Sequence, residues 1–186
     1  MNKSNNDKKV LLILVGMSDT FCDVQSKRYL PPTEKTIASL NSILGKHVST
    51  IDGIVSVNSP GDTFKTVNYK HPVATKNIKF SLCTKNFLAQ YNSFEVKSSV
   101  DDEHLVMNGD QFDYLFNPND YEIHLAGVDI YGIFVPIISE LKEAGFDITV
   151  YSDAIRPFNR SVVDHIKEHC TYTSAQTALG NKRHLV

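Results

Sequence analysis

The stretch from Tyr121 to Asp153, YEIHLAGVDIYGIFVPIISELKEAGFDITVYSD, limits the possible folds of this chain more than any other. Its apolar residues predict a buried strand over 123–126, a turn at 127–129, a helix, and a second buried strand over 147–151. Two short apolar runs that flank a helix, within about 30 residues, are typical of a right-handed βαβ unit. Because the strands of such a unit are parallel, the stretch predicts an α/β protein with a parallel sheet.

The ends of the predicted helix carry local signals, and they also indicate where functional residues should lie. Pro136 suits the first helical turn, where its missing N–H costs no hydrogen bond, and Gly145 suits the helix end. In a parallel sheet, the residues that follow the carboxyl end of a strand face the ligand crevice. We therefore expect functional residues between Gly127 and Ile133.

The rest of the chain alternates between strand and helix patterns. Apolar runs predict strands over 10–15, 51–57, 94–96, 105–107 and 170–173. Helices are predicted from Pro31 to Gly45 and over 84–91, 159–169 and 174–179. This alternation indicates a three-layer α/β/α sandwich with a central, mostly parallel sheet of Rossmann type. We expect a flexible N-terminus over residues 1–9 and a single domain over residues 10–186.

Composition and charge narrow the class of protein. Hydrophobic residues make up 41% of the chain and charged residues 22%, which is ordinary for a globular protein. The formal net charge of -2, without a basic stripe, predicts no binding to nucleic acid or to a membrane. The first apolar run, 10–15, is too short for a signal-peptide core or a membrane span, so we expect a cytoplasmic protein.

The cysteines and histidines do not predict a metal site. The three cysteines are widely spaced, without a CxxC pair, which argues against a disulfide framework and against zinc. Only His165 and His169 have the i, i+4 spacing that can hold zinc, and a solvated pair is the favoured interpretation. His124 lies within a predicted strand, where we expect it to be hydrogen-bonded. No cofactor is predicted.

Several short motifs occur in a defined order along the chain. They are LLILVGMSDTFCD (11–23), Pro-Pro-Thr-Glu (31–34), His-Pro (71–72), GVDIYGIF (127–134), GFDITVYSDAIRP (145–157) and CTYTSAQTAL (170–179). In content and order these motifs resemble those of the isochorismatase-like cysteine hydrolases, the superfamily that includes nicotinamidases. The resemblance spans nearly the whole chain and implies the isochorismatase-like fold.

The resemblance also implies a catalytic triad, which this sequence lacks. In the family a Cys thiolate attacks a carbonyl carbon, an Asp handles the proton, and a Lys stabilises the charged groups. The Asp position corresponds to Gly16, the Lys position to Asn108 and the Cys position to Ile133. Losing one member of such a unit removes almost all of its covalent catalysis, so we expect a degenerate triad and no catalytic residue here.

The family's metal ligands, an Asp and a His after the second strand, correspond to the turn at 58–61, where Asp62 is the nearest ligand. A single carboxylate makes a poor metal site, so none is predicted. The candidates to line the crevice are Phe21, Cys22, Ser59, Asp62, Gly109, Val128, Asp129, Tyr131 and Phe134.

Two groups of side chains could replace the lost triad. Cys22 is the candidate nucleophile, although a packed thiol is favoured. Loop carboxylates could form an acid/base pair, although hydrogen bonds to nearby backbone N–H groups are favoured. These carboxylates are Asp19, Asp23, Asp110 and Asp113.

The favoured function is that of a catalytically degenerate isochorismatase-like domain, a pseudoenzyme that acts as a binding or assembly module. The resemblance implies a dimer or larger homo-oligomer, and another protein is a second possible partner. One alternative is an active hydrolase of a small amide or vinyl ether, with a rebuilt site in which Asn108 donates to the oxyanion. Another is a sensor that binds a small metabolite without turnover.

Overall fold

The structure, a computed structural model, describes residues 8–17, 19–57, 79–81, 97–100, 103–106, 116–129, 132–180 and 182. The N-terminal elements are β1 (Lys9–Val15), α1 (Asp19–Cys22), α2 (Thr33–His47), a 3-10 turn (Val48–Thr50) and β2 (Gly53–Val57). Three short strands follow, β3 (Lys79–Ser81), β4 (Lys97–Val100) and β5 (Glu103–Val106). The C-terminal elements are β6 (Tyr121–Val128), α5 (Phe134–Glu143), β7 (Ile148–Arg156), α6 (Arg160–His169), β8 (Thr171–Thr173) and α7 (Ala175–Gly180).

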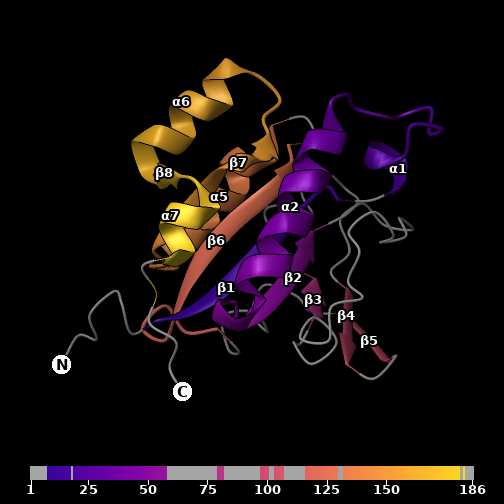
Figure 1. The fold of residues 1–186 in the computed structure, drawn as a ribbon. Coiled ribbons are helices and arrows are strands. Elements are labelled where there is room, and N and C mark those ends of the chain that lie inside the picture. Colours follow the sequence, from indigo (N-terminus) through magenta and orange to yellow (C-terminus); the bar gives the residue numbers. More distant parts are fainter. Residues whose placement is uncertain are drawn as a thin grey trace.

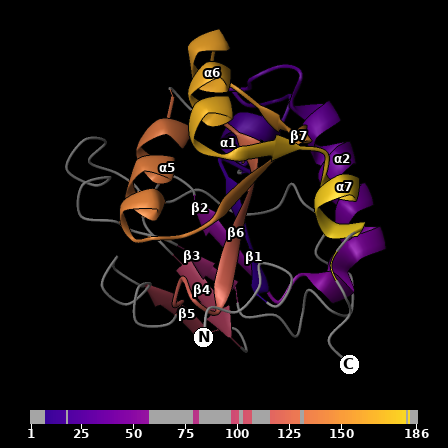
Figure 2. The same cartoon turned by 90° about the vertical axis from the view of Figure 1, so that its left-hand side faces the viewer.

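The strands form one sheet in the order β5-β4-β3-β2-β1-β6-β7-β8. The neighbouring strands β3, β2, β1, β6, β7 and β8 pair parallel with one another. Strand β4 pairs antiparallel with both of its neighbours, β3 and β5. Helices α2 and α7 cover one face of the sheet, and α5 and α6 cover the other (Figures 1 and 2). The predicted three-layer α/β/α sandwich with a mostly parallel sheet is therefore confirmed.

The βαβ unit predicted from the Tyr121–Asp153 stretch is also present. Strands β6 and β7 are parallel neighbours joined by α5. Pro136 lies in the first turn of α5, and Gly145, with φ 90°, follows the C-cap residue Ala144. Proline and glycine therefore mark the two ends of this helix as expected.

Several predicted boundaries were wrong because tertiary contacts extend the elements. Strand β6 continues through Gly127 and Val128, which were expected in a turn, since its pairing with β1 runs as far as Val15 and Gly127. Helix α2 continues past Gly45 to His47, because its buried face outweighs the glycine penalty of about 1 kcal/mol.

The first described residues, 8 and 9, already contact the sheet. Strand β1 begins at Lys9, and the Lys8 ammonium lies 2.7 Å from the Asp147 carboxylate. The helix predicted over 84–91 and the strand predicted over 94–96 lie outside the described residues.

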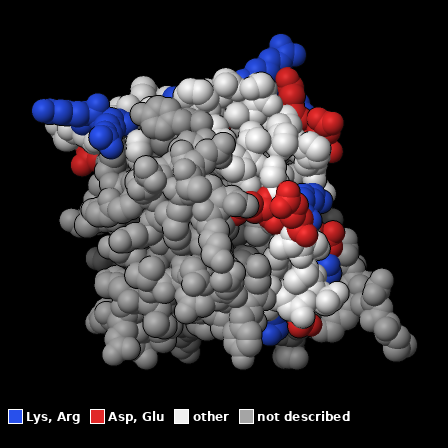
Figure 3. Space-filling model, turned by 180° about the vertical axis from the view of Figure 1, so that it is seen from behind, with Lys and Arg blue, Asp and Glu red and all other residues white. Residues whose placement is uncertain are grey.

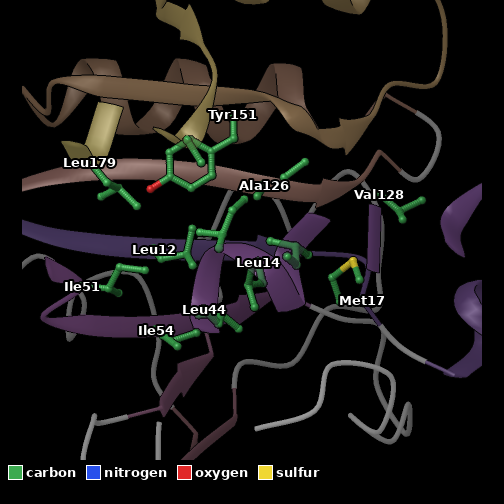
Figure 4. Packing of buried hydrophobic residues seen from close by; sticks show 14 of the residues in the cluster. Leu12, Leu14, Met17, Leu44, Ile51, Ile54, Ala126, Val128, Tyr151 and Leu179 are labelled. Carbon is green, nitrogen blue, oxygen red and sulfur yellow. The ribbon is translucent and has the colours of Figure 1, made fainter. Parts of the chain in front are cut away.

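Two hydrophobic clusters pack on opposite faces of the sheet. Leu11, Ile13 and Val15 point into the cluster under α5 and α6, whereas Leu12 and Leu14 point into the cluster under α2 and α7. Figure 4 shows the second cluster. A strand buried on both faces has a continuous apolar sequence, which explains why residues 10–15 lack an alternating pattern.

The surface of the described residues carries charges of both signs. On the face opposite to the view of Figure 1, acidic and basic side chains lie side by side in the described part (Figure 3). This mixture agrees with the near-neutral formal charge of -2.

Candidate functional site

Strands β1 and β6 are neighbours at the centre of the sheet, and the chain leaves them towards opposite sides. Strand β1 is followed by β2 on one side, and β6 is followed by β7 on the other. Ligands of open parallel sheets bind where the strand order reverses in this way. We call the residues at this point, 15–17 and 127–129, the switch edge.

Gly127 allows the two strands to approach closely at the switch edge. Its φ is +119°, and a Cβ atom at this position would lie 2.1 Å from the Val15 carbonyl oxygen. Real Cβ atoms never approach an oxygen so closely, so only glycine fits here. The register between β6 and β7 also shifts between Leu125 and Gly127, which marks a local irregularity at the same place.

Two of the three degenerate triad positions are among the described residues. Gly16 is buried directly after β1, with φ 63°. Ile133 is 0% exposed and lies with Val15 in the cluster under α5 and α6. Asn108 lies outside the described residues, so its convergence with the other two stays a prediction.

Asp129, directly after β6, links the switch edge by hydrogen bonds to the start of α5 and to the end of β7 and the loop after it. Its Oδ1 atom accepts a hydrogen bond from the Phe134 amide, and its Oδ2 atom accepts one from the Phe158 amide, both at 3.0 Å. Its own amide donates to the Arg156 carbonyl at 2.8 Å. The side chain of the α5 N-cap residue, Ile133, cannot accept, so Asp129 supplies the acceptor that the first helical turn needs.

The Asp129 carboxyl is 0% exposed, and this burial shifts its protonation. Burial raises the pKa of Asp129 above its usual range, because a charged carboxylate is poorly solvated there. Hydrogen bonds from backbone amides oppose this shift only in part. Asp129 was predicted to line the crevice, but its role as a buried acceptor was missed; an Asp shortly before a helix is the local signal for such a cap.

The other described crevice candidates are all buried. Cys22 is 4% exposed, and its thiol donates to the Gly16 carbonyl at 3.6 Å. Phe21 and Val128 pack with it in the cluster under α2 and α7, whereas Phe134 lies in the opposite cluster. The candidates Ser59, Asp62, Gly109 and Tyr131 lie outside the described residues, and so do the carboxylates Asp110 and Asp113.

The loop carboxylate Asp23 binds a nearby backbone N–H group, which is the interpretation that the sequence favoured. Its Oδ1 atom accepts the Gln25 amide at 2.8 Å, so it stabilises its own turn. The Asp19 side chain is outside the described part of the structure.

A second group of polar residues is buried under α7, and the sequence interpretation identified only its histidine. The His124 ring is hydrogen-bonded at both nitrogens, at 2.6 Å from Nε2 to Glu122 Oε1 and at 2.6 Å from Nδ1 to the Tyr151 hydroxyl. The Lys182 ammonium lies 2.7 Å from Glu122 Oε2. We call these four residues the buried polar cluster; Tyr151 appears in Figure 4 beside Leu179 of α7.

The buried polar cluster fixes the charge of its carboxylate. Burial tends to raise the pKa of Glu122, but hydrogen bonds from His124 and Lys182 outweigh it, so the pKa lies below its ordinary value. Burial also raises the pKa of Tyr151, with Glu122 and Asp153 adding to the effect, so this hydroxyl stays protonated. The cluster joins β6, β7 and the segment after α7 by charge-assisted hydrogen bonds.

An open depression of about 310 Å³ lies at the opposite edge of the sheet from the switch edge. It is lined by starting residues of β7 and β8 and by the ends of α5 and α6, among them Lys142, Asp147, Glu168, His169 and Thr171. Two of its acidic residues are paired with lysines, Asp147 with Lys8 and Glu122 of β6 with Lys182. It does not coincide with the predicted crevice.

The His165–His169 pair lies on α6 as predicted, with ring centroids 4.4 Å apart. Burial and the neighbouring His169 lower the pKa of His165. Among the described residues, no group of three or more His, Cys, Asp or Glu side chains could hold a metal ion.

The chain is similar in structure to isochorismatase-like hydrolases. An isochorismatase family protein from Desulfovibrio vulgaris is 13% identical in sequence, with a TM-score of 0.63. The match covers 94% of this chain and 97% of that chain. An isochorismatase-like hydrolase from Alkaliphilus metalliredigens is 10% identical, with a TM-score of 0.62 and coverage of 92% and 98%. The nicotinamidase from Staphylococcus aureus is 15% identical, with a TM-score of 0.57 and coverage of 89% and 99%. The sequence itself matches no protein-family model and no curated protein.

These likenesses define the class of fold. The chain has the isochorismatase-like α/β fold, and the resemblance inferred from the sequence motifs is confirmed at this level. At 10–15% identity the likeness does not extend to activity, because one fold can hold many functions. In the described part of the chain, no helix has the length and apolar character needed to span a bilayer.

Proposed function

We propose that this protein is a catalytically degenerate isochorismatase-like domain that works in the cytoplasm as a binding or assembly module. The observation that carries the proposal is the burial of Ile133, the residue at the nucleophile position, within the hydrophobic core. Covalent catalysis needs a nucleophile that can reach substrate, and an isoleucine in the core offers neither a nucleophile nor access.

The groups around Ile133 support the same conclusion. Gly16 cannot serve as the acid or base of a triad, since it has no side chain. The thiol of Cys22 points at the Gly16 carbonyl inside the core, whereas a reactive thiol needs partial exposure and a nearby positive charge. The Phe134 amide, at the start of α5, donates its hydrogen bond to the Asp129 carboxylate.

The proposed assembly is a homo-oligomer, which two exposed apolar side chains support. Val24, 58% exposed, and Phe158, 51% exposed, are large apolar side chains on loops that follow α1 and β7. Both loops leave the sheet from its carboxyl edge, and a contact between copies would bury these side chains.

Two measurements test the proposal. Purified protein is assayed with nicotinamide, simple amides and isochorismate, beside Cys22→Ala as the control; we expect no turnover by either. Turnover that the Cys22→Ala change abolishes would overturn the degenerate reading in favour of a rebuilt hydrolase. Light scattering at micromolar concentration should give the mass of a dimer or larger species, and a monomer alone would contradict assembly.

A further inference from the structure

Two histidine rings approach each other on one face of α6. His165 and His169 are one helical turn apart, at i, i+4, and His169 is the last residue of the helix. Their ring centroids lie 4.4 Å apart, and the ring planes are tilted by 54°. The Cβ atoms of such a pair are about 5–6 Å apart, so the rings converge and do not point away from each other.

Solvation does not account for the inner ring of this pair. The sequence favoured a solvated pair, but the Nε2 atom of His165 is enclosed by protein and has no hydrogen-bond partner among the described residues. Buried ring nitrogens are nearly always hydrogen-bonded, and a bound ion is one of the few other partners that satisfy such an atom. His169 is the outer member, with 44% of its side chain exposed, so an ion in solution can reach the pair.

The surroundings of the pair favour the neutral imidazole that a metal ion requires. Burial and the neighbouring His169 lower the pKa of His165, so protons compete less for its nitrogen at neutral pH. Glu168 opposes this shift in part, because its Oε2 atom lies only 3.9 Å from His169 Nε2. The same carboxylate places a negative charge beside the position that a cation would take.

The spacing of the two rings fits two ligands of one ion. A transition-metal ion binds imidazole nitrogen at about 2.1 Å, and a tetrahedral angle between two such bonds places the ring centres about 5 Å apart. The observed 4.4 Å differs from this value by an amount that a small ring rotation corrects. In the part of the chain that the structure describes, no third His, Cys, Asp or Glu completes a larger ligand group.

We propose that His165 and His169 bind one divalent transition-metal ion, such as Zn²⁺, with water in its remaining positions. The site goes beyond the proposed function, because neither histidine belongs to the triad positions or to the switch edge. Two protein ligands are fewer than the three or four of tightly held zinc, so the ion exchanges with solution. When bound, it holds the last turn of α6 together.

Thermal unfolding in the presence of Zn²⁺ tests the site. The pair is organised only in the folded helix, so the unfolding temperature of the wild type should rise in a saturable manner with added zinc chloride. His169→Ala should lose this rise. His47→Ala is the matched control, since His47 is hydrogen-bonded to Gln176 and has no histidine one turn away, and it should respond as the wild type does. Magnesium chloride should have no such effect, because Mg²⁺ prefers oxygen ligands.

Calorimetric titration of the folded protein with Zn²⁺ measures the same binding without unfolding. His169→Ala should bind zinc more weakly than the wild type, and adding His165→Ala should weaken the binding no further, because one imidazole cannot chelate. The other histidines are unchanged in these variants, so zinc bound elsewhere contributes equally to each. If wild type and His169→Ala bind zinc with the same affinity, the proposal is overturned.

The zinc titration is independent of the proposed function. Turnover by the wild-type protein would overturn that function and leave the difference between wild type and His169→Ala intact. Equal zinc binding by the two proteins would remove the metal site and leave the inert triad positions as they are.

Discussion

The Nδ1 atom of His124 lies 2.6 Å from the hydroxyl of Tyr151, on the sheet face that α2 and α7 cover. On the other side of the ring, Nε2 donates to the Glu122 carboxylate, so both ring nitrogens of His124 have a hydrogen-bond partner. The rings meet edge to face, with centroids 5.3 Å apart. One hydrogen-bonded chain therefore runs from the interior of the sheet to the carboxylate that binds Lys182.

Tyr151→Phe should destabilise the fold, since it leaves a buried ring nitrogen of His124 without its hydrogen-bond partner. The cost of such an unsatisfied group is about 1–3 kcal/mol. Urea unfolding at neutral pH measures the change, and Tyr172→Phe is the matched control, because Tyr172 is only partly buried on the outer strand β8. Equal effects of the two changes would contradict the importance of the buried polar cluster.

Removing the charge of Glu122 should make stability depend less on pH. The pKa of Glu122 is lowered in the folded state, so its ion pair stabilises the fold above the unfolded pKa of about 4.3 and is lost as the pH falls through the folded value. The advantage of the wild type over Glu122→Gln should therefore shrink on acidification. Urea midpoints across the acidic range measure it, and a constant difference would contradict the prediction.

Asp129 should show the opposite dependence on pH. Its pKa is raised in the folded state, so its contribution is fully present below the unfolded pKa of about 3.9 and is lost as the pH rises through the folded value. Relative to Asp129→Asn, the wild type should gain stability on acidification. Urea unfolding across the same pH range gives the sign of this change in stability difference. If the difference instead falls on acidification, as expected for Glu122, the burial of Asp129 is not the dominant effect.

Gly127→Ala should be among the most damaging single changes, whereas Gly45→Ala should stabilise. A methyl group at Gly127 would collide with the Val15 carbonyl, and its φ of +119° is unfavourable for alanine. At Gly45, inside α2, nothing lies within 4 Å of the new methyl group, and the gain in helix propensity is about 1 kcal/mol. Thermal unfolding measures the stability of both variants. If Gly127→Ala and Gly45→Ala changed the unfolding temperature alike, the close approach of β1 and β6 at Gly127 would be contradicted.

The described thiols should resist labelling in the folded protein. Cys22 is buried, and burial raises the pKa of the Cys170 thiol to about 11, so little thiolate forms at neutral pH. In a Cys83→Ser background, labelling with a thiol reagent should be slow until denaturant is added. Rapid labelling of Cys22 would revive it as a candidate nucleophile.

Local patterns were enough to predict the frame of this fold. The β6–α5–β7 unit follows from apolar runs, from Pro136 and from Gly145, and each of these signals acts within a few residues. Strand ends were less predictable, since β6 continues as far as its neighbour β1 offers partners.

The site depends on longer-range relationships, which no local pattern carries. His124 and Tyr151 are 27 residues apart, and they meet only because β6 and β7 pair in one particular register. Asp129 was named from its position after a strand, but its second hydrogen bond comes from a loop 29 residues away. Burial of Ile133 and Cys22 likewise depends on how the layers close, so the sequence alone left an active site open as an alternative.

Because β1 lies at the centre of the sheet, its backbone hydrogen bonds should be the last to break during unfolding. From Leu11 to Val15 this strand is paired on both sides, with β2 and with β6, and both of its faces are buried. Its amide protons can reach water only when the whole sheet separates. Their exchange with deuterated solvent therefore reports the global unfolding free energy, while amides at the edge strand β8 exchange through smaller, local openings.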